Sequence, residues 1–435
     1  MNYWKLGCNW GRGRPDFYSL LREKRIVICG DSPMAKGDWV LICQGYDAVA
    51  LAKIGSVPVL STARADLQTD FARLQITYGE TNSVADAAEF YELTESERFQ
   101  YQLQQGICRI NNPEIRGTIE HILTAREKTK MITQATKLLK SKKNVILQGA
   151  PGTGKTYATA ALALSVIGVA DVDFNDHAAV MQKYEELRGQ KRIFFTTFHQ
   201  SMDYEDFVEG IKPQVEDGQV GYSVEDGIFK NVCQSVPEGG ESLRSVVLII
   251  DEINRGNVAR IFGELISLLE ADKRSDAVHP LAVTLPYSKE EFSVPGEVYI
   301  IGTMNTTDRS AGTLDYAVRR RFAFVTLKSD REAVLRSYPD ATLGEKAVAV
   351  FDDVQKFIKE HNAGDLDIED LMVGHSYFMA ADEDGLKLKI KYEVLPLIRE
   401  YAKDGLLAVA ADELERCGAA WRELSVPPAP AATAE

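Results

Sequence analysis

A glycine-rich stretch, GAPGTGKT, constrains the fold more than any other feature of this sequence. It follows an apolar segment at residues 145–147 that predicts a buried strand, and it precedes an alanine-rich segment at residues 157–167 that predicts a helix. The stretch fits G-x-x-x-x-G-K-[ST] at every fixed position, in the strand–turn–helix context of a phosphate-binding loop. The residues that we expect to bind nucleotide are Gly149, Ala150, Pro151, Gly152, Thr153, Gly154, Lys155 and Thr156.

The chemistry of phosphate binding explains these residue types. Glycines allow successive backbone N–H groups to point at the phosphates, and the N-terminus of the following helix adds positive potential. We expect Lys155 to reach the β- and γ-phosphates, and the hydroxyl of Thr156 to complete the Mg²⁺ shell. The alternative is a glycine-rich turn without function, which would not require the strand, the helix and every fixed position together.

The region around this loop alternates apolar segments with helical ones. Further strands are predicted at residues 193–197, 245–250, 298–301 and 322–327, and the chain after residue 330 has helical periodicity. Such alternation is typical of a parallel α/β sheet. The segment at residues 245–250 is apolar without a period of two, as expected for a central strand that helices cover on both faces.

Polar residues follow the predicted central strands. Asp251 and Glu252 come directly after residues 245–250. An acidic pair alone is usually a solvated turn, but with a phosphate-binding loop on the same sheet we expect Asp251 to hold Mg²⁺ beside Thr156. Glu252 is then placed to polarise the attacking water, which favours a hydrolase over a passive nucleotide-binding protein.

Two further polar stretches extend the predicted site. Asn305, at the end of a strand between the other two, is placed to hydrogen-bond the attacking water and the γ-phosphate. The stretch Asn-Thr-Thr-Asp is only weakly similar to the guanine-reading Asn-Lys-x-Asp of G proteins. Arginines occupy residues 319–321; they form either a solvated basic turn or a group that completes a neighbouring subunit's site in trans.

These motifs resemble AAA+ ATPases, and more closely the McrB group of modification-dependent (type IV) restriction systems. The specific stretches, in the order of that group, are TFHQS at 197–201, YEDFVEG at 204–210, GIFK at 227–230, DEINR at 251–255, MNTTDRS at 304–310, RRRF at 319–322 and GHSYF at 374–378. Thr307 stands where the group often has alanine. We expect His199 and His375 to form hydrogen bonds rather than to take part in catalysis.

The resemblance implies roles for further residues and for partners. It implies Asp251 and Glu252 as metal and catalytic carboxylates, Asn305 as a sensor, Arg320 or Arg321 as an arginine finger, and Arg255, Asp308 and Arg309 as parts of a subunit junction. It further implies a hexameric ring that uses GTP or ATP with Mg²⁺ and stimulates a separate McrC-like nuclease. The chain itself has no Asp…Glu-x-Lys nuclease constellation. The alternatives are a MoxR-like ATPase that remodels proteins, and a nucleotide-gated scaffold.

The first 60 residues carry aromatic and basic side chains close together. They resemble an EVE domain of the PUA-like group, a small β-barrel that reads modified bases. Such side chains can stack on a flipped base and hold its phosphates, or they can simply fill a barrel core. The candidates for DNA binding are Asn9, Trp10, Arg12, Arg14 and Trp39.

Composition and charge narrow the class of protein further. The chain has 435 residues and a formal net charge of −14, which argues against coating nucleic acid by bulk charge. No apolar run approaches the roughly 18 residues needed to span a bilayer. With six scattered cysteines and no secretory signal, we expect a cytoplasmic protein. We expect an EVE/PUA-like domain over residues 1–75, a linker over 76–115, an AAA+ core over 116–328, a helical lid over 329–425 and a disordered tail over 426–435.

Overall fold

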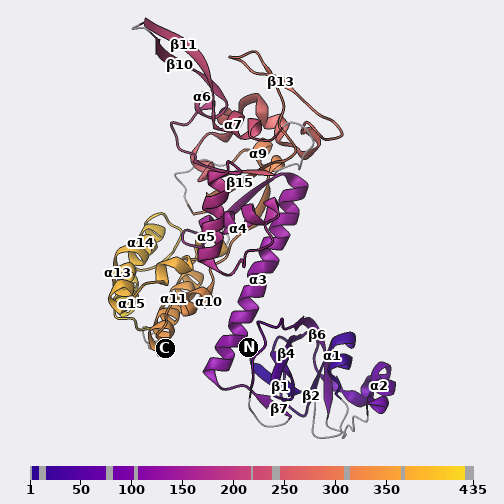
Figure 1. Ribbon diagram of the computed structural model, residues 1–435. Helices are drawn as coiled ribbons and strands as arrows, with labels where there is room; N and C mark the ends of the chain where they lie inside the picture. Colours follow the sequence, from indigo (N-terminus) through magenta and orange to yellow (C-terminus); the bar gives the residue numbers. More distant parts are fainter. Residues whose placement is uncertain are drawn as a thin grey trace. The chain divides into compact units, whose positions relative to one another are not determined.

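The computed structural model describes residues 2–8, 16–74, 82–101, 106–216, 219–237, 245–307, 314–363 and 368–426. The chain forms two compact units, Met1–Arg126 and Glu127–Glu435 (Figure 1). The long helix α3 (Pro113–Lys142) runs across the boundary between them. In the part of the chain that is described, no helix is long and apolar enough to cross a membrane. Most of the predicted tail lies outside the described residues.

The first unit is built on a seven-stranded sheet in the order β2-β6-β4-β3-β1-β7, with β5 paired to β6. Strand β1 runs parallel to β3, and the other pairs are antiparallel. The elements are β1 (Tyr3–Gly7), α1 (Tyr18–Lys24), β2 (Ile26–Gly30), β3 (Trp39–Gln44), β4 (Asp47–Ile54), β5 (Val59–Leu60), the 3₁₀ turns η1 (Ser61–Ala63) and η2 (Ala65–Leu67), α2 (Gln68–Arg73), β6 (Ser83–Glu92) and β7 (Ile107–Arg109).

The predicted linker over residues 76–115 is wrong, because it contains two strands of this sheet. Strand β6 pairs with β2, β4 and β5, and β7 pairs with β1. Polar side chains stand at every third position of β6 rather than at alternate ones, so its sequence does not read as a strand, although Val84 and Ala85 are buried in the core. Strands β2, β3 and β4 lie within the first 60 residues, which resemble a small β-barrel in sequence. That this unit is an EVE/PUA-like barrel stays a prediction.

The second unit contains a five-stranded parallel sheet in the order β16-β8-β15-β12-β9. Its elements are β8 (Asn144–Gly149), α4 (Lys155–Ile167), α5 (His177–Gly189), β9 (Ile193–Thr197), α6 (Tyr204–Phe207), β10 (Glu209–Glu216), β11 (Gln219–Asp226), α7 (Ile228–Gln234), β12 (Val246–Asp251), η3 (Ile253–Arg255), α8 (Val258–Phe262), η4 (Gly263–Leu269), η5 (Ala271–Lys273), β13 (Val283–Thr284), β14 (Glu291–Phe292), β15 (Val298–Asn305), α9 (Tyr316–Arg321) and β16 (Ala323–Thr326).

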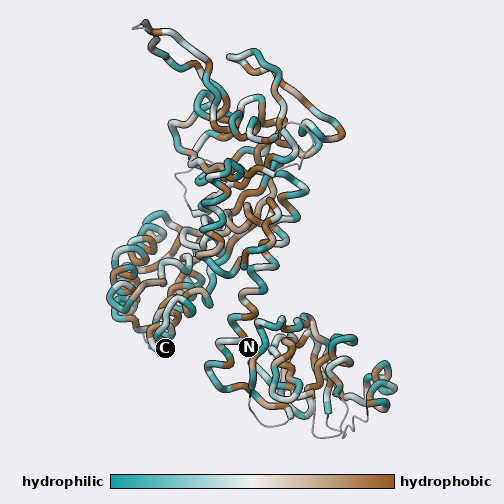
Figure 2. The backbone as a smooth tube through the Cα atoms, viewed as in Figure 1, coloured by the Kyte–Doolittle hydropathy of each residue, from teal (hydrophilic) through white to brown (hydrophobic). Residues whose placement is uncertain are grey.

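Helices cover both faces of the parallel sheet, so its strands are apolar throughout. One core packs Ile146, Leu248 and Ile300 against α7, α8, η4 and α9. The other core packs Val145, Val247 and neighbouring residues against α3, α4 and α5. Figure 2 shows the resulting hydrophobic centre of this unit. The predicted parallel α/β fold with flanking helices is therefore confirmed.

A helical subdomain with its own core follows the sheet, as predicted. It comprises α10 (Arg331–Arg336), α11 (Ala341–His361), α12 (Ile368–Leu371), η6 (His375–Phe378), α13 (Glu383–Lys389), the π-helical turn η7 (Ile390–Val394), α14 (Leu395–Lys403) and α15 (Ala411–Arg422). Tyr338 fixes η6 to α10 because its hydroxyl donates to the carbonyl of Phe378 at 2.7 Å.

Candidate nucleotide-binding site

The glycine-rich loop joins β8 to α4, as the sequence predicts. Gly149, Gly152 and Gly154 have φ angles of 154°, 77° and 79°, which residues with a Cβ adopt only with strain. The Oγ1 of Thr153 donates to the carbonyl of Ala150 at 2.9 Å and closes the turn. The loop therefore has the backbone conformation that directs N–H groups into a phosphate cradle.

Lys155, the first residue of α4, is largely buried in this loop. Its Nζ donates to the carbonyls of Gly149 and Ala150, both at 2.9 Å. Burial lowers the pKa of Lys155 to about 8, although the charges of Glu252 and Asp251 act in the opposite direction. A buried ammonium held by neutral carbonyls gains more from an anionic ligand than a solvated one would. The loop is thus prepared for a phosphate group.

The two predicted carboxylates lie at the carboxyl end of β12, and Thr303 on the neighbouring strand β15 fixes them. The Oγ1 of Thr303 donates to Oδ1 of Asp251 and accepts from the backbone N–H of Glu252 at 3.0 Å. Thr303 is 2 % exposed. Sequence reasoning missed this residue. The sequence did contain a signal for it: Thr303 precedes Asn305 by two positions on one strand, so the two side chains share a face.

Glu252 is held on both carboxylate oxygens. The Nδ2 of Asn305 donates to Oε1, and the Nε of Arg255 donates to Oε2 at 3.2 Å. Glu252 has a φ of 52°, which is left-handed and unusual for glutamate; such strain clusters at functional sites. The structure therefore brings Asn305 and Arg255 together on Glu252, although Arg255 was expected at a subunit junction. It places β15 between β8 and β12, as predicted.

The residues at this end of the sheet fit Mg²⁺ bound together with a nucleotide. Within the described ranges no group of three or more His, Cys, Asp and Glu side chains could hold a metal ion by itself. Mg²⁺ usually takes only one or two protein carboxylates, together with substrate phosphates and waters. Asp251 would supply one carboxylate, and Thr156, at the start of α4, is exposed.

The helical subdomain contacts the loop directly. The N–H of Gly374 donates to the carbonyl of Pro151, and that of Ser376 to the carbonyl of Gly152, both at 3.1 Å. A Cβ on Gly374 would lie 2.1 Å from the carbonyl carbon of Gly152, so only glycine allows this approach. The sequence marked this segment as a motif without giving it a role.

His375 lies between these two backbone contacts. Its Nδ1 accepts from the N–H of Asp330 at 3.2 Å, which confirms the predicted hydrogen-bonding role. Burial lowers the pKa of His375, although the nearby Asp330 acts in the opposite direction. The imidazole is therefore neutral at pH 7 and serves to hold the subdomain in place.

The two candidate fingers, Arg320 and Arg321, have different environments. The side chain of Arg320 is 71 % exposed and pairs with Glu270 at 2.6 Å, whereas that of Arg321 is 10 % exposed and pairs with the same carboxylate at 3.0 Å. The Nε of Arg321 is buried without a hydrogen-bond partner. Of the two side chains, that of Arg320 is by far the more exposed to solvent. Asp308 and Arg309 lie outside the described residues.

The structure contradicts the predicted DNA contact of Trp39. Its side chain is 4 % exposed, its ring stacks on that of Tyr91 with centroids 5.9 Å apart, and the Nζ of Lys53 lies 5.4 Å from its centroid. A ring already covered by protein offers no face to a base, so Trp39 belongs to the core of the first unit. Asn9, Trp10, Arg12 and Arg14 lie outside the described residues.

Comparisons with known proteins agree with this geometry. Residues 177–322 match the AAA domain family of the dynein-related subfamily, and residues 347–408 match the α-helical lid domain of McrB. The chain thus carries an AAA domain followed by a helical lid of the McrB type. The AAA match begins after the glycine-rich loop, so the assignment of that loop rests on its motif and its geometry.

Two relatives are subunits of restriction enzymes. The chain is 36 % identical over 286 residues to the type IV methyl-directed restriction enzyme EcoKMcrB subunit of Escherichia coli K12, a match that covers 62 % of this chain and 56 % of that protein. It is 26 % identical over 242 residues to the type II restriction enzyme BsuMI component YdiS of Bacillus subtilis 168, covering 50 % and 67 %. The chain therefore spans little more than half the length of the first relative.

A solved structure from Cytophaga hutchinsonii covers 73 % of this chain and 87 % of its own, at 12 % identity and a TM-score of 0.27. That similarity is too low to inform fold or function.

Proposed function

We propose that this chain is a Mg²⁺-dependent GTPase or ATPase of the AAA+ class, and that it is the recognition and motor subunit of a modification-dependent restriction complex. The observation that carries the proposal is the joint position of Lys155, Asp251 and Glu252 at the carboxyl ends of β8 and β12. Thr303 and Asn305 on β15 hold the two carboxylates. A passive nucleotide-binding protein has no use for a strained, oriented glutamate at this place.

The described residues divide the chemistry of hydrolysis between them. Lys155 binds phosphate oxygens and offsets their charge, with Thr156 and Asp251 placed to hold the metal. Mg²⁺ bound at this site would neutralise negative charge on the phosphates. Glu252 accepts a proton from the attacking water, and Asn305 orients that water. Thr303 keeps Asp251 and the backbone of Glu252 at a fixed separation.

The wider role follows from the relatives and the sequence motifs. Similarity to two restriction-enzyme subunits supports a role for this chain in defence against foreign DNA. We propose a hexameric ring, a separate McrC-like nuclease partner, and binding of DNA with a modified base by the first unit. A MoxR-like remodelling ATPase would share Lys155, Asp251 and Glu252. The lid of the McrB type favours the restriction role over that alternative.

Turnover of GTP and of ATP by the full chain tests the enzymatic part of the proposal. Phosphate release would be measured with and without Mg²⁺, for the wild type and for Lys155→Ala. We expect Mg²⁺-dependent turnover of at least one nucleotide, and its loss in the variant. Turnover that persisted in Lys155→Ala would assign hydrolysis to another site.

Binding of matched DNA duplexes tests the recognition part. Unmodified, methylcytosine and hydroxymethylcytosine duplexes would be compared with the full chain at one fixed salt concentration, because phosphate contacts change steeply with ionic strength. We expect tighter binding of a modified duplex. Equal binding of all three duplexes would not affect the proposed NTPase activity. It would favour recognition of another base modification, or a motor that remodels proteins.

A further inference from the structure

The hairpin of β10 and β11 is a separate two-stranded sheet. The strands pair in regular antiparallel register, from Glu209 opposite Asp226 at the base to Glu216 opposite Gln219. Figure 1 shows the hairpin extending away from the parallel sheet of its own unit. An isolated two-stranded hairpin is marginally stable in water without a packed face. We therefore ask which partner covers the faces of this hairpin.

One face of this hairpin is apolar and exposed. The register places Ile211 opposite Val224, and Pro213 opposite Tyr222; residues opposite each other on paired strands share a face. Ile211 is 47 % exposed, Tyr222 is 75 % exposed and Val224 is 42 % exposed. Val220, two positions before Tyr222 and on the same face, is 65 % exposed. These side chains form the apolar face, and the alternate positions Lys212, Gln214 and Ser223 form the polar face.

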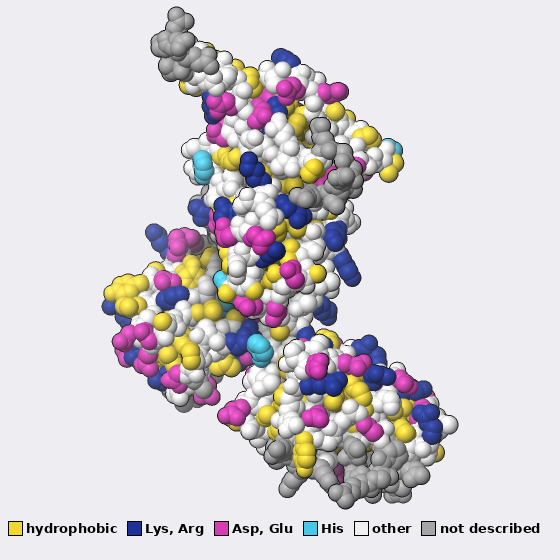
Figure 3. All heavy atoms as spheres, viewed as in Figure 1, with side chains coloured by type: hydrophobic (Ala, Val, Ile, Leu, Met, Phe, Trp, Pro, Cys, Tyr) yellow, Lys and Arg dark blue, Asp and Glu magenta, His cyan; other side chains and the backbone are white. Residues whose placement is uncertain are grey.

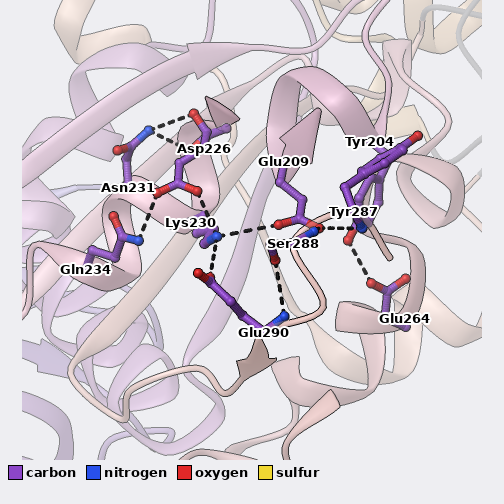
Figure 4. A network of polar contacts seen from close by, with 11 residues as sticks. Tyr204, Glu209, Asp226, Lys230, Asn231, Gln234, Glu264, Tyr287, Ser288 and Glu290 are labelled. Atoms are coloured by element: carbon purple, nitrogen blue, oxygen red, sulfur yellow. Dashed lines mark hydrogen bonds and ion pairs between the residues drawn. The ribbon is translucent and has the colours of Figure 1, made fainter. Parts of the chain in front are cut away.

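The base of the hairpin is firmly anchored (Figure 4). Glu209, which is fully buried, accepts from the backbone N–H groups of Tyr287 and Ser288 at 2.9 and 3.0 Å. Despite its burial the pKa of Glu209 is lowered, because Ser288, Tyr287 and Lys230 stabilise its charge. An anchored base with an uncovered apolar face is typical of a surface that is presented to a partner.

Lys230 completes this anchor from α7. Its Nζ pairs with Asp226 and Glu290, both at 2.7 Å, and with Glu209 at 3.4 Å. The ammonium thus ties the two ends of the hairpin to the loop before β14. A Cβ on Gly227, between β11 and α7, would lie 2.4 Å from the backbone of Phe207, so the chain leaves the hairpin along one tightly packed path.

The charge around the hairpin selects the class of partner. Residues 203–230 and 286–292 carry ten acidic and three basic side chains, a formal net charge of −7. Two of the three lysines, Lys212 and Lys230, are engaged in ion pairs. Figure 3 shows acidic side chains gathered near the hairpin. Such a surface repels nucleic-acid phosphates and attracts lysine and arginine.

We propose that the apolar face binds a segment of another protein in which apolar side chains alternate with lysine or arginine. The apolar side chains of the segment cover Ile211, Tyr222 and Val224, and its cations meet the acidic surroundings. Backbone groups at the outer edge of either strand can extend the contact by strand addition. The proposal is independent of the proposed nucleotide chemistry, since none of these residues belongs to that site.

A labelled peptide tests the proposal with the full chain. The probe is a fluorescein-labelled ten-residue peptide in which valine and tyrosine alternate with lysine, and its control has glutamate in place of every lysine. Fluorescence anisotropy would be measured for the wild type, for Tyr222→Lys on the apolar face and for Gln214→Lys on the polar face. These variants add the same charge to the hairpin. We expect the lysine peptide to bind, Tyr222→Lys to lose about tenfold or more in affinity, and Gln214→Lys to lose much less.

Several results would overturn the proposal. If the glutamate peptide bound as tightly as the lysine peptide, the charge of the surroundings would not select the partner. If both variants lost affinity equally, the apolar face would not be the binding surface. Displacement of the lysine peptide by duplex DNA from the wild type would assign the surface to nucleic acid. A change of oligomeric state in Tyr222→Lys alone, measured by sedimentation velocity, would assign it to a second copy of this chain. Unchanged thermal unfolding of both variants would establish that the hairpin remains folded.

Discussion

The two units of this chain use aromatic and polar residues in opposite ways. In the first unit Trp39, a candidate for DNA binding, is 4 % exposed and belongs to a core, as does Trp4, which is 6 % exposed. In the second unit Asp251, Glu252 and Asn305, at strand ends, converge on the glycine-rich loop as expected. Residue type therefore misled at Trp39 in the first unit, whereas position at the end of a parallel strand brought the expected polar residues together in the second.

The physical reason lies in the topology of the two sheets. In a parallel sheet the carboxyl ends of all strands lie at one edge, so residues far apart in sequence meet there. In the antiparallel sheet of the first unit, either face of a strand can be the inner one, and an aromatic side chain suits both. Trp4, for example, sits in the core with its indole N–H donated to Asp38 at 2.9 Å.

The largest expected effect is a loss of hydrolysis, and it distinguishes the two adjacent arginines, Arg320 and Arg321. Arg320→Ala should lower hydrolysis by about 10³-fold if Arg320 acts as a finger. Arg321→Ala should mainly lower stability, because its side chain is buried against Glu270. Phosphate release by mixtures of Arg320→Ala with Lys155→Ala subunits measures action in trans. Absence of rescue in every mixture would count against that geometry.

Glu252→Gln should lower turnover by about 10²-fold or somewhat more while leaving nucleotide binding intact, because glutamine keeps the shape but cannot accept the proton. Turnover and binding would be measured on the same preparation. Glu185→Gln on the exposed surface of α5 is the matched control. Normal hydrolysis by Glu252→Gln would mean that another group is the general base.

Trp39→Ala tests whether Trp39 is a core residue of the first unit. We expect it to lower the free energy of unfolding by about 3–5 kcal/mol, the usual cost of removing a large buried aromatic side chain. Tyr46→Ala, at a position that is 63 % exposed, should change it by less than about 0.5 kcal/mol. Urea unfolding measures both. A stable Trp39→Ala protein that lost DNA binding would restore Trp39 as a base reader.

Thr303→Val should lower turnover by about tenfold, because the buried N–H of Glu252 and one oxygen of Asp251 lose their common partner. Thr303→Ser keeps the hydroxyl and should retain most of the activity. Steady-state turnover of the two variants provides the measurement. Loss of activity in Thr303→Ser together with normal activity in Thr303→Val would show that the methyl group, rather than the hydrogen bonds, matters.

The smallest expected effect concerns pH. Nucleotide affinity should fall as the pH rises through 8, by at most about tenfold per unit, because Lys155 loses its proton near pH 8 and the neutral amine no longer pairs with phosphate. Titration calorimetry between pH 7.5 and 9.5 would measure it, with proton uptake as a second readout. Lys155→Arg stays charged, so any binding that it retains should not fall in this way.

The same shift affects the stability of the nucleotide-free protein. The pKa of Lys155 in the folded chain, about 8, lies below the ordinary lysine value of 10.5, so the unfolded chain binds more protons between these values. Stability should therefore rise with pH across that window through this residue. A flat contribution of Lys155, seen by comparison with Lys155→Arg, would contradict the burial of its ammonium.

The sequence by itself determined the parallel sheet, the glycine-rich loop and the residues at the strand ends, because local motifs and apolar segments have few physical alternatives. Only the tertiary structure decided that Thr303 joins Asp251 to Glu252, that Gly374 packs on Gly152, and that β6 and β7 belong to the first sheet. Those contacts join residues distant in sequence, and no local pattern specifies their pairing. Burial decided the rest, since Trp39 and Arg321, both candidates by sequence, are covered by other side chains.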